Sequence, residues 1–170
     1  LRSLHATFDV TKMPTSKVGA CDQPLGYYVG FQIGLVDTTT THHVDIADCE
    51  ASFATVGMKL QEGAHHLTVR QSSLHDNGIM QEHGTPNAWD LGAWGMLLQA
   101  DDSLIVDNRL KNNNSKCLLP LGAPQRFGGN AIELYNANRN LIYRNRAEQD
   151  RVFSELGRKQ EVGKTCDDNV

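Results

Sequence analysis

The sequence has no apolar run that approaches the length of a transmembrane helix, so it predicts no membrane-spanning helix. No segment places apolar residues at three-to-four spacing over ten or more positions, which argues against a helical fold. Excess positive charge is also missing, because the formal net charge is −4 over 170 residues. That balance argues against a nucleic-acid partner and against an anionic membrane. A signal peptide is absent and the chain opens on Leu1, so we expect a mature or truncated product, a fragment of a longer molecule.

Cysteine is sparse, and its spacing is informative. The four cysteines lie far apart, at Cys21, Cys49, Cys117 and Cys166. No Cys-x-x-Cys pair occurs, which argues against a zinc site. We therefore expect a secreted, extracellular protein with at least one disulfide, for which four cysteines allow three connectivities. The alternative is buried free thiols, with Cys49 as one of them.

A two-part phrase of alternating apolar residues occurs twice in the second half of the chain. The copies occupy 95–110 and 130–147, and their alignment places Asn108 on Asn145 and Met96 on Ile132. Each copy has a short alternating run, a polar turn, a second alternating run, an Asn and one more apolar residue. Such self-similarity is the sequence signature of a repeat architecture.

Two weaker copies precede these, at 57–74 and 30–51. The column that holds Asn in the later copies then reads Cys49, Ser72, Asn108 and Asn145. Alternation predicts an inward set of Met58, Leu60, Met96, Leu98, Ile132 and Leu134. A slip of one residue would exchange the inward and outward sets.

This pattern resembles the repeat of right-handed parallel β-helix proteins, the coil of the pectate-lyase-like superfamily. In that family a coil has three short strands joined by three turns, and an Asn at the second turn stacks on its equivalents above and below. The resemblance covers roughly residues 28–157 and implies an all-β solenoid of about four coils. Residues 1–26 would form an N-terminal cover or partial coil, and 158–170 a polar tail. An α/β solenoid and an antiparallel sandwich are the alternatives.

Two inserts interrupt the repeat after its third strand, at about 76–93 and 112–129. Inserts on one edge of a solenoid usually build its binding face. The first carries His83 and Trp89, with Trp94 beside it, and the second carries Arg126. Aromatic rings in a groove suit the apolar faces of sugars, although the Trp residues would equally suit a small core within the loop.

The outward residues of the first strands form the predicted site. Lys59 and Glu133 share one outward column, with Leu97 between them. We predict Glu133 and Lys59 as catalytic residues, because a glycosidase needs carboxyl groups and a β-elimination needs a base and a cation. The predicted substrate-binding residues are Gln61, Gln99, Tyr135, His83, Trp89, Trp94 and Arg126. Other acids available for catalysis are Asp101, Asp102 and Glu155.

The catalytic motifs of the superfamily are missing. The chain lacks the clustered Asp residues that hold Ca²⁺ in pectate lyases, the motif set of polygalacturonases and the Asp-Pro-His-Asp of alginate epimerases. The resemblance therefore implies a fold and carries over no catalytic residue. Two hypotheses remain. The first is a secreted polysaccharide lyase or glycoside hydrolase, for which Ca²⁺ is a possible cofactor. The second is a non-catalytic glycan-binding or adhesin-like segment. The expected partner is a polysaccharide in either case.

Two histidine pairs, His42-His43 and His65-His66, occupy the same turn in successive copies. They would form a small stack, but adjacent strand residues point to opposite faces. We therefore interpret them as solvated turn residues and predict no metal site there.

Overall fold

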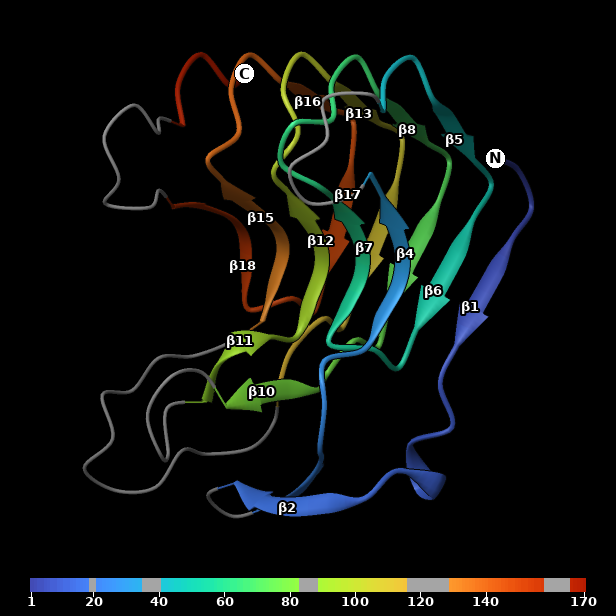
Figure 1. The fold of residues 1–170 in the computed structure, drawn as a ribbon, viewed down its shortest axis with the longest axis vertical. Coiled ribbons are helices and arrows are strands. Elements are labelled where there is room, and N and C mark those ends of the chain that lie inside the picture. The colour runs from blue at the N-terminus through green and yellow to red at the C-terminus, as the bar shows by residue number, and fades with distance from the viewer. Residues whose placement is uncertain (19–20, 35–40, 83–88, 116–128, 158–165) are drawn as a thin grey trace.

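The structure, a computed structural model, describes residues 1–18, 21–34, 41–82, 89–115, 129–157 and 166–170 (Figure 1). Three parallel sheets contain most of the strands. Sheet one contains β18 (Val152–Gly157), β15 (Asn130–Tyr135), β12 (Trp94–Leu98), β7 (Val56–Leu60) and β4 (Val29–Ile33). Sheet two contains β16 (Leu141–Tyr143), β13 (Leu104–Val106), β8 (Thr68–Arg70) and β5 (Asp45–Ala47). Sheet three contains β1 (His5–Thr7), β6 (Glu50–Ser52), β9 (Ser73–His75), β14 (Arg109–Lys111) and β17 (Arg146–Glu148).

The chain visits these sheets in rotation, so each circuit adds one strand to each sheet. β7, β8 and β9 make one circuit, and β12, β13 and β14 make the next and pair in parallel with them. The protein is a right-handed parallel β-helix of four to five coils, as the repeat predicts. In Figure 1 the strands of sheet one stand side by side from β18 to β4.

The corners of each coil are set by residues in the left-handed conformation, five positions apart. In the coil of β7, β8 and β9 these corners are His66, Gln71 and Asp76, with φ of 53–54°. The equivalent corners in the next coil are Asp102, Asp107 and Asn112, with φ of 51–56°. Asn and Asp tolerate this conformation better than most residues. A three-residue strand between corners places one side chain inward, so inward residues recur every five positions along sheets two and three.

The Asn column predicted from the repeat is confirmed. Nδ2 of Asn108 donates to Oδ1 of Asn145 at 2.9 Å, and the backbone N–H of Asn108 donates to the same oxygen at 3.0 Å. Asn108 in turn accepts from the backbone N–H of Ser72 at 3.0 Å and donates to the Val69 carbonyl at 3.0 Å. The amide thus satisfies backbone groups that the tight corner leaves unpaired.

Two further ladders escaped the sequence prediction. At the third corner, Asn77 donates to Asn113 and Asn113 donates to Asp150, both at 2.8 Å. At the first corner, Oδ1 of Asn140 accepts from the backbone N–H of Ser103 at 2.9 Å. Nδ2 of Asn140 donates to Oδ1 of Asn169 in the next coil at 3.0 Å. At all three corners, side-chain amides, or residues that replace them such as Asp150, therefore form hydrogen bonds between successive coils.

The core fills the inside of the coils, and the predicted register is confirmed. All six residues predicted to point inward are at most 2% exposed: Met58, Leu60, Met96, Leu98, Ile132 and Leu134. Sheets two and three contribute further large side chains to this core: Ile46, Val69, Leu74, Ile105 and Leu110. Packing is tight enough that a Cβ on Gly95 would lie 2.7 Å from the Ala131 carbonyl oxygen.

The expected disulfide is not found among the described cysteine side chains. Cys49 and Cys166 are free thiols, and the side chains of Cys21 and Cys117 lie outside the described residues. Cys49 takes the place of Asn in the second-corner column, where its thiol is 2% exposed. The alternative of a buried free thiol is therefore correct for Cys49.

The two ends of the chain extend the repeat. β1 pairs in parallel with β6, so part of the predicted N-terminal cover is a strand of sheet three. Within the same segment, η1 (Val10–Lys12) is a short 3-10 helix. β2 (Thr15–Val18) and β3 (Cys21–Pro24) form an antiparallel hairpin. At the other end Asn169 joins the first-corner ladder. No helix within the described ranges is long and apolar enough to cross a membrane.

The first insert leaves the coil after β9 and contains a hairpin of β10 (Met80–Glu82) and β11 (Trp89–Gly92). In Figure 1 this hairpin lies at the lower end of sheet one. Most of the second insert lies outside the described residues.

Candidate functional site

One outward column crosses all five strands of sheet one. Lys59 is the register partner of Gln32 on one side and of Leu97 on the other. Leu97 is paired with Glu133, and Glu133 is paired with Glu155 of β18. The structure therefore places Lys59 and Glu133 in the predicted column, with Leu97 between them, and adds a second carboxyl group beside Glu133.

Glu133 and Glu155 share a hydrogen-bond donor. Nδ2 of Asn130 lies 2.6 Å from Oε2 of Glu133 and 3.0 Å from Oε2 of Glu155. The two carboxyl oxygens cannot be farther apart than these two distances together. This upper limit admits the roughly 5–5.5 Å between carboxyl groups that is typical of retaining glycosidases. We call Glu133, Glu155 and Asn130 the paired-acid site.

The two acids have different surroundings. Glu133 is only 8% exposed, although its strand position faces away from the core. Burial raises the pKa of Glu133 from 4.5 to about 7, the hydrogen bond from Asn130 opposes that rise, and the nearby charge of Glu155 adds to it. Glu155 is exposed. Two carboxyl groups in unlike environments are the arrangement that separates an acid from a nucleophile or base.

Lys59 turns toward the opposite side of the column. Its Nζ lies 5.5 Å from the centroid of the Tyr27 ring, in a cation–π contact. Partial burial lowers the pKa of Lys59 and raises the pKa of Tyr27 to about 12. The catalytic role of Lys59 stays a prediction. Its ammonium group contacts the Tyr27 ring.

Trp94 occupies a second apolar cluster on the outer surface of sheet one. It packs with Val56 and Leu97, and Tyr135 lies against the same cluster. Trp94 is 8% exposed, so its ring covers the sheet instead of forming an open stacking platform. Trp94 thus packs on the sheet itself and not within the insert, and its role in substrate binding stays a prediction.

The predicted polar column contains two buried acceptors. Gln61 is 5% exposed and Gln99 is partly buried. Within the described part of the chain, the Oε1 atoms of Gln61 and Gln99 are both buried and have no hydrogen-bond partner. The Oδ1 atom of Asn130, in the paired-acid site, has the same property. Buried acceptors of this kind are costly unless something donates to them.

Several predicted residues cannot be placed. His83 and Arg126 lie outside the described residues, and so does the side chain of Trp89.

Asp101 and Asp102, two of the other acids available for catalysis, lie in the first-corner turns and make hydrogen bonds there. Asp102 accepts from Nε and Nη2 of Arg139, each at 2.7 Å, and this guanidinium holds the pKa of Asp102 below its usual range. Asp101 accepts from the backbone and side chain of Asn138 at 2.8 and 3.1 Å. These contacts explain both acids as turn residues.

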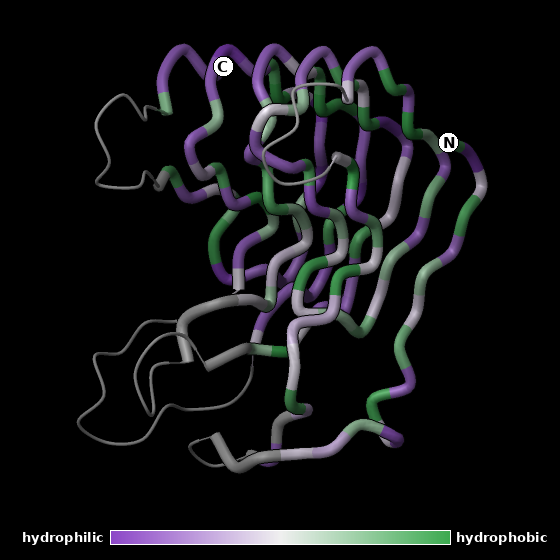
Figure 2. The backbone as a smooth tube through the Cα atoms, viewed as in Figure 1, coloured by the Kyte–Doolittle hydropathy of each residue, from purple (hydrophilic) through white to green (hydrophobic). Residues whose placement is uncertain are grey.

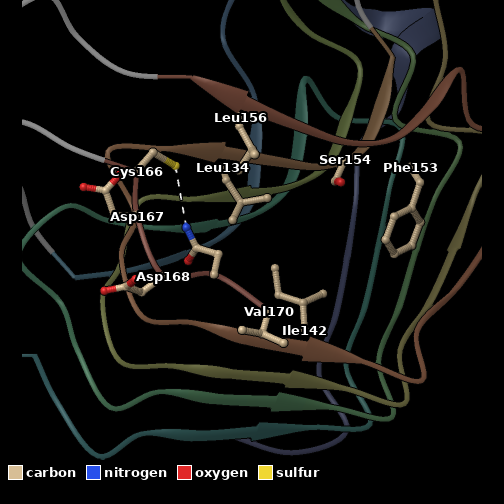
Figure 3. Close-up of a pocket in the computed structure, with 10 residues that line it drawn as sticks. Leu134, Ile142, Phe153, Ser154, Leu156, Cys166, Asp167, Asp168 and Val170 are labelled. Atoms are coloured by element: carbon tan, nitrogen blue, oxygen red, sulfur yellow. Dashed lines mark hydrogen bonds between the residues drawn. The ribbon is translucent and has the colours of Figure 1, made fainter.

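A cavity of about 380 Å³ lies at the end of the solenoid that carries β18 (Figure 3). It is lined by the inward residues Leu134 and Ile142 and by Phe153 and Leu156 of β18, with Cys166 and the residues after it on another side. The lining does not include the paired acids. The cavity is therefore a feature of the open end and not of the outer face of sheet one.

Sequence reasoning missed Asn130 and the pairing of Glu155 with Glu133. One signal was available, because Glu133-Leu134 and Glu155-Leu156 repeat the same dipeptide on successive strands. No sequence signal shows that one Asn130 amide would contact both carboxyl groups.

The fold and this face define a parallel β-helix protein with paired carboxyl groups on one outer sheet. No protein-family model matches the chain, and no curated protein or solved structure matches it either.

Proposed function

We propose that the chain acts on a polysaccharide and that the paired-acid site hydrolyses a glycosidic bond. The observation that carries this proposal is the sharing of the Asn130 amide by Glu133 and Glu155. Two neighbouring carboxyl groups, one of which has a raised pKa, are the minimum that a retaining glycosidase requires. The proposal includes membership of the pectate-lyase-like superfamily and an extracellular location, where such polymers occur.

Glu133 has the properties of the general acid. With its pKa at about 7, the carboxyl group keeps its proton under mildly acidic conditions and can deliver it to the leaving oxygen. After that step the same carboxylate can accept a proton from the incoming water. A carboxyl group with an ordinary pKa would have lost its proton already under those conditions.

Glu155 has the properties of the nucleophile. It is exposed beside Glu133, so a sugar ring lying over β15 and β18 can reach its carboxylate. Attack of Glu155 on the anomeric carbon forms a glycosyl ester as the leaving oxygen takes the Glu133 proton, and water then hydrolyses the ester. Asn130 holds both carboxyl groups in place through one amide nitrogen.

The buried acceptors support glycan binding on the same sheet. Oε1 of Gln61 and Oε1 of Gln99 lack a donor and are buried, so sugar hydroxyl groups would donate to them once these side chains turn outward. This observation also supports the second candidate, a glycan-binding module without catalysis. A lyase that uses Lys59 as its base is less supported, because Lys59 contacts Tyr27 and lies apart from the paired acids.

A panel of neutral and acidic polysaccharides separates these candidates. Release of reducing ends without absorbance from unsaturated uronides supports hydrolysis, and the appearance of that absorbance would show a lyase instead. Retention of a polysaccharide on the protein with no product after prolonged incubation would identify a binding module.

A further inference from the structure

Two histidine pairs lie one above the other in the row of turns that joins sheet one to sheet two. Figure 2 shows that this row of turns, along the top of the view, is hydrophilic. The rings of His42 and His65 stack with their centroids 5.2 Å apart, and those of His43 and His66 stack at 5.1 Å. Four imidazoles from two successive coils thus form one group, which we call the histidine stack.

Within each pair the two rings turn toward each other. The Nδ1 atoms of His42 and His43 are hydrogen-bonded at 2.8 Å, and those of His65 and His66 at 2.7 Å, so a metal ion bound by both nitrogens of a pair would replace the shared proton. The expectation that adjacent histidines point to opposite faces is therefore wrong. Its assumption of an extended strand fails because His43 and His66 occupy corner positions, each with a φ of 54°.

This spacing suits one type of metal coordination. Donors at a right angle around an ion with metal–nitrogen bonds of about 2.0–2.1 Å stand roughly 2.8–3.0 Å apart, whereas tetrahedral donors stand roughly 3.3–3.4 Å apart. Tetragonal coordination by nitrogen is typical of Cu²⁺ and Ni²⁺. We propose that each histidine pair chelates a divalent transition-metal ion, Cu²⁺ in preference to Ni²⁺ and Ni²⁺ in preference to Zn²⁺.

The rest of the coordination shell would be water. As the side chains stand, no group of three or more His, Cys, Asp or Glu residues within the described ranges could hold a metal ion. In the next coil Asp102 is bound to Arg139 and Asp101 to Asn138, so neither carboxylate is free to join the stack. Each pair therefore acts as a two-nitrogen chelate at the surface.

The two pairs are too close to be filled independently. Their rings are about one coil apart, and two divalent ions at that separation repel each other. Binding of the first ion therefore weakens binding of the second. We expect a stoichiometry near one ion per chain, with either pair able to hold it.

Calorimetric titration of the whole chain with CuCl₂, NiCl₂ and ZnCl₂ at pH 7.5, in a buffer that does not bind metals, tests the proposal. His43→Asn leaves the second pair intact and should lower Cu²⁺ affinity no more than about twofold. His43→Asn/His66→Asn leaves one imidazole in each pair and should lower Cu²⁺ affinity at least tenfold. Asn is chosen because it tolerates the left-handed conformation at both positions.

The matched control is His5→Asn, which removes an exposed imidazole paired with Glu50 on sheet three. It should bind Cu²⁺ as the wild type does, and circular dichroism should show the same strand content in every variant. Wild-type affinity in the double variant, or a loss in His5→Asn equal to that of the double variant, would overturn the proposal. A full loss in His43→Asn alone would also overturn it, because one pair would then be insufficient.

Discussion

Glu133 of β15 and Glu155 of β18 are register partners on adjacent parallel strands, and both carboxyl groups contact Nδ2 of Asn130. The β-helix brings this about by simple stacking, since residues at equivalent positions of successive coils lie about 4.8 Å apart. Two acids that would be distant in most folds are thereby placed as neighbours. The difference between them comes from burial, which affects Glu133 far more than Glu155.

The burial of Glu133 predicts a pH-dependent stability. Its folded-state pKa of about 7 lies above its ordinary value of 4.5, so the native state binds more protons than the unfolded chain between those values. The free energy of unfolding should therefore fall as pH rises from about 4.5 to 7, by up to about 3 kcal/mol. Urea denaturation at a series of pH values measures this loss.

Glu133→Gln should remove most of that pH dependence, because the amide does not titrate. Its stability should match the wild type near pH 5 and exceed it near pH 8. Glu155→Gln is the comparison variant: it removes the Glu155 charge, which raises the pKa of Glu133 less than burial does, and should therefore reduce the slope only in part. Equal slopes for the wild type and Glu133→Gln would show that Glu133 titrates normally.

The core predicts a sharp contrast between two adjacent residues of β14. Leu110 is fully buried, whereas its neighbour Arg109 is exposed and pairs with Glu148 at 3.4 Å. Leu110→Ala should reduce the free energy of unfolding by about 2–5 kcal/mol through lost burial and a cavity. Arg109→Ala should cost less than about 1 kcal/mol, as exposed ion pairs do. Similar costs at the two positions, measured by urea denaturation, would contradict the register.

Much of this architecture could be predicted from the sequence. The alignment of Asn108 with Asn145 and the inward set from Met58 to Leu134 were both correct, because strict alternation and a repeated amide are local signals. The outward column of Lys59, Leu97 and Glu133 followed from the same register.

The remaining features depend on what the coils bring together. The ladder of Asn77, Asn113 and Asp150 was missed because Asn77 and Asn113 lie inside the segments assigned to the inserts, and because its third member is Asp. The histidine geometry was missed because the corner conformation at His43 is not evident from an extended-strand pattern. The contact of the Asn130 amide with both Glu133 and Glu155 depends on side-chain conformations, which the spacing of residues in the sequence does not determine.

The Asn ladder predicts a second stability effect. Asn108→Ala would leave the Ser72 N–H and the Val69 carbonyl without their partner in a buried corner. Each such group costs about 1–3 kcal/mol, so a loss of roughly 2–5 kcal/mol is expected by urea denaturation. Asn108→Ser should recover part of that loss, because Ser72 occupies the same position one coil earlier. No difference between the Ala and Ser variants would show that the hydrogen bonds matter little at this corner.

The general acid predicts the form of the pH–rate profile. With the pKa of Glu133 at about 7, kcat/KM should fall above roughly pH 7 as the carboxyl group loses its proton. Initial rates of reducing-end release, measured from pH 4 to 9 on whichever polysaccharide the panel identifies, give the profile. An activity that keeps rising through pH 8 would exclude Glu133 as the acid.

Turnover of two matched variants on that polysaccharide tests the central claim most directly. Glu133→Gln and Glu155→Gln each keep the shape of the side chain, and each should lower kcat at least 100-fold, as loss of a general acid or a nucleophile does. Gln32→Ala, in the same column at the far strand, is the control and should change kcat less than threefold. Wild-type turnover in both Glu variants would contradict the account and remove this face of the β-helix from consideration.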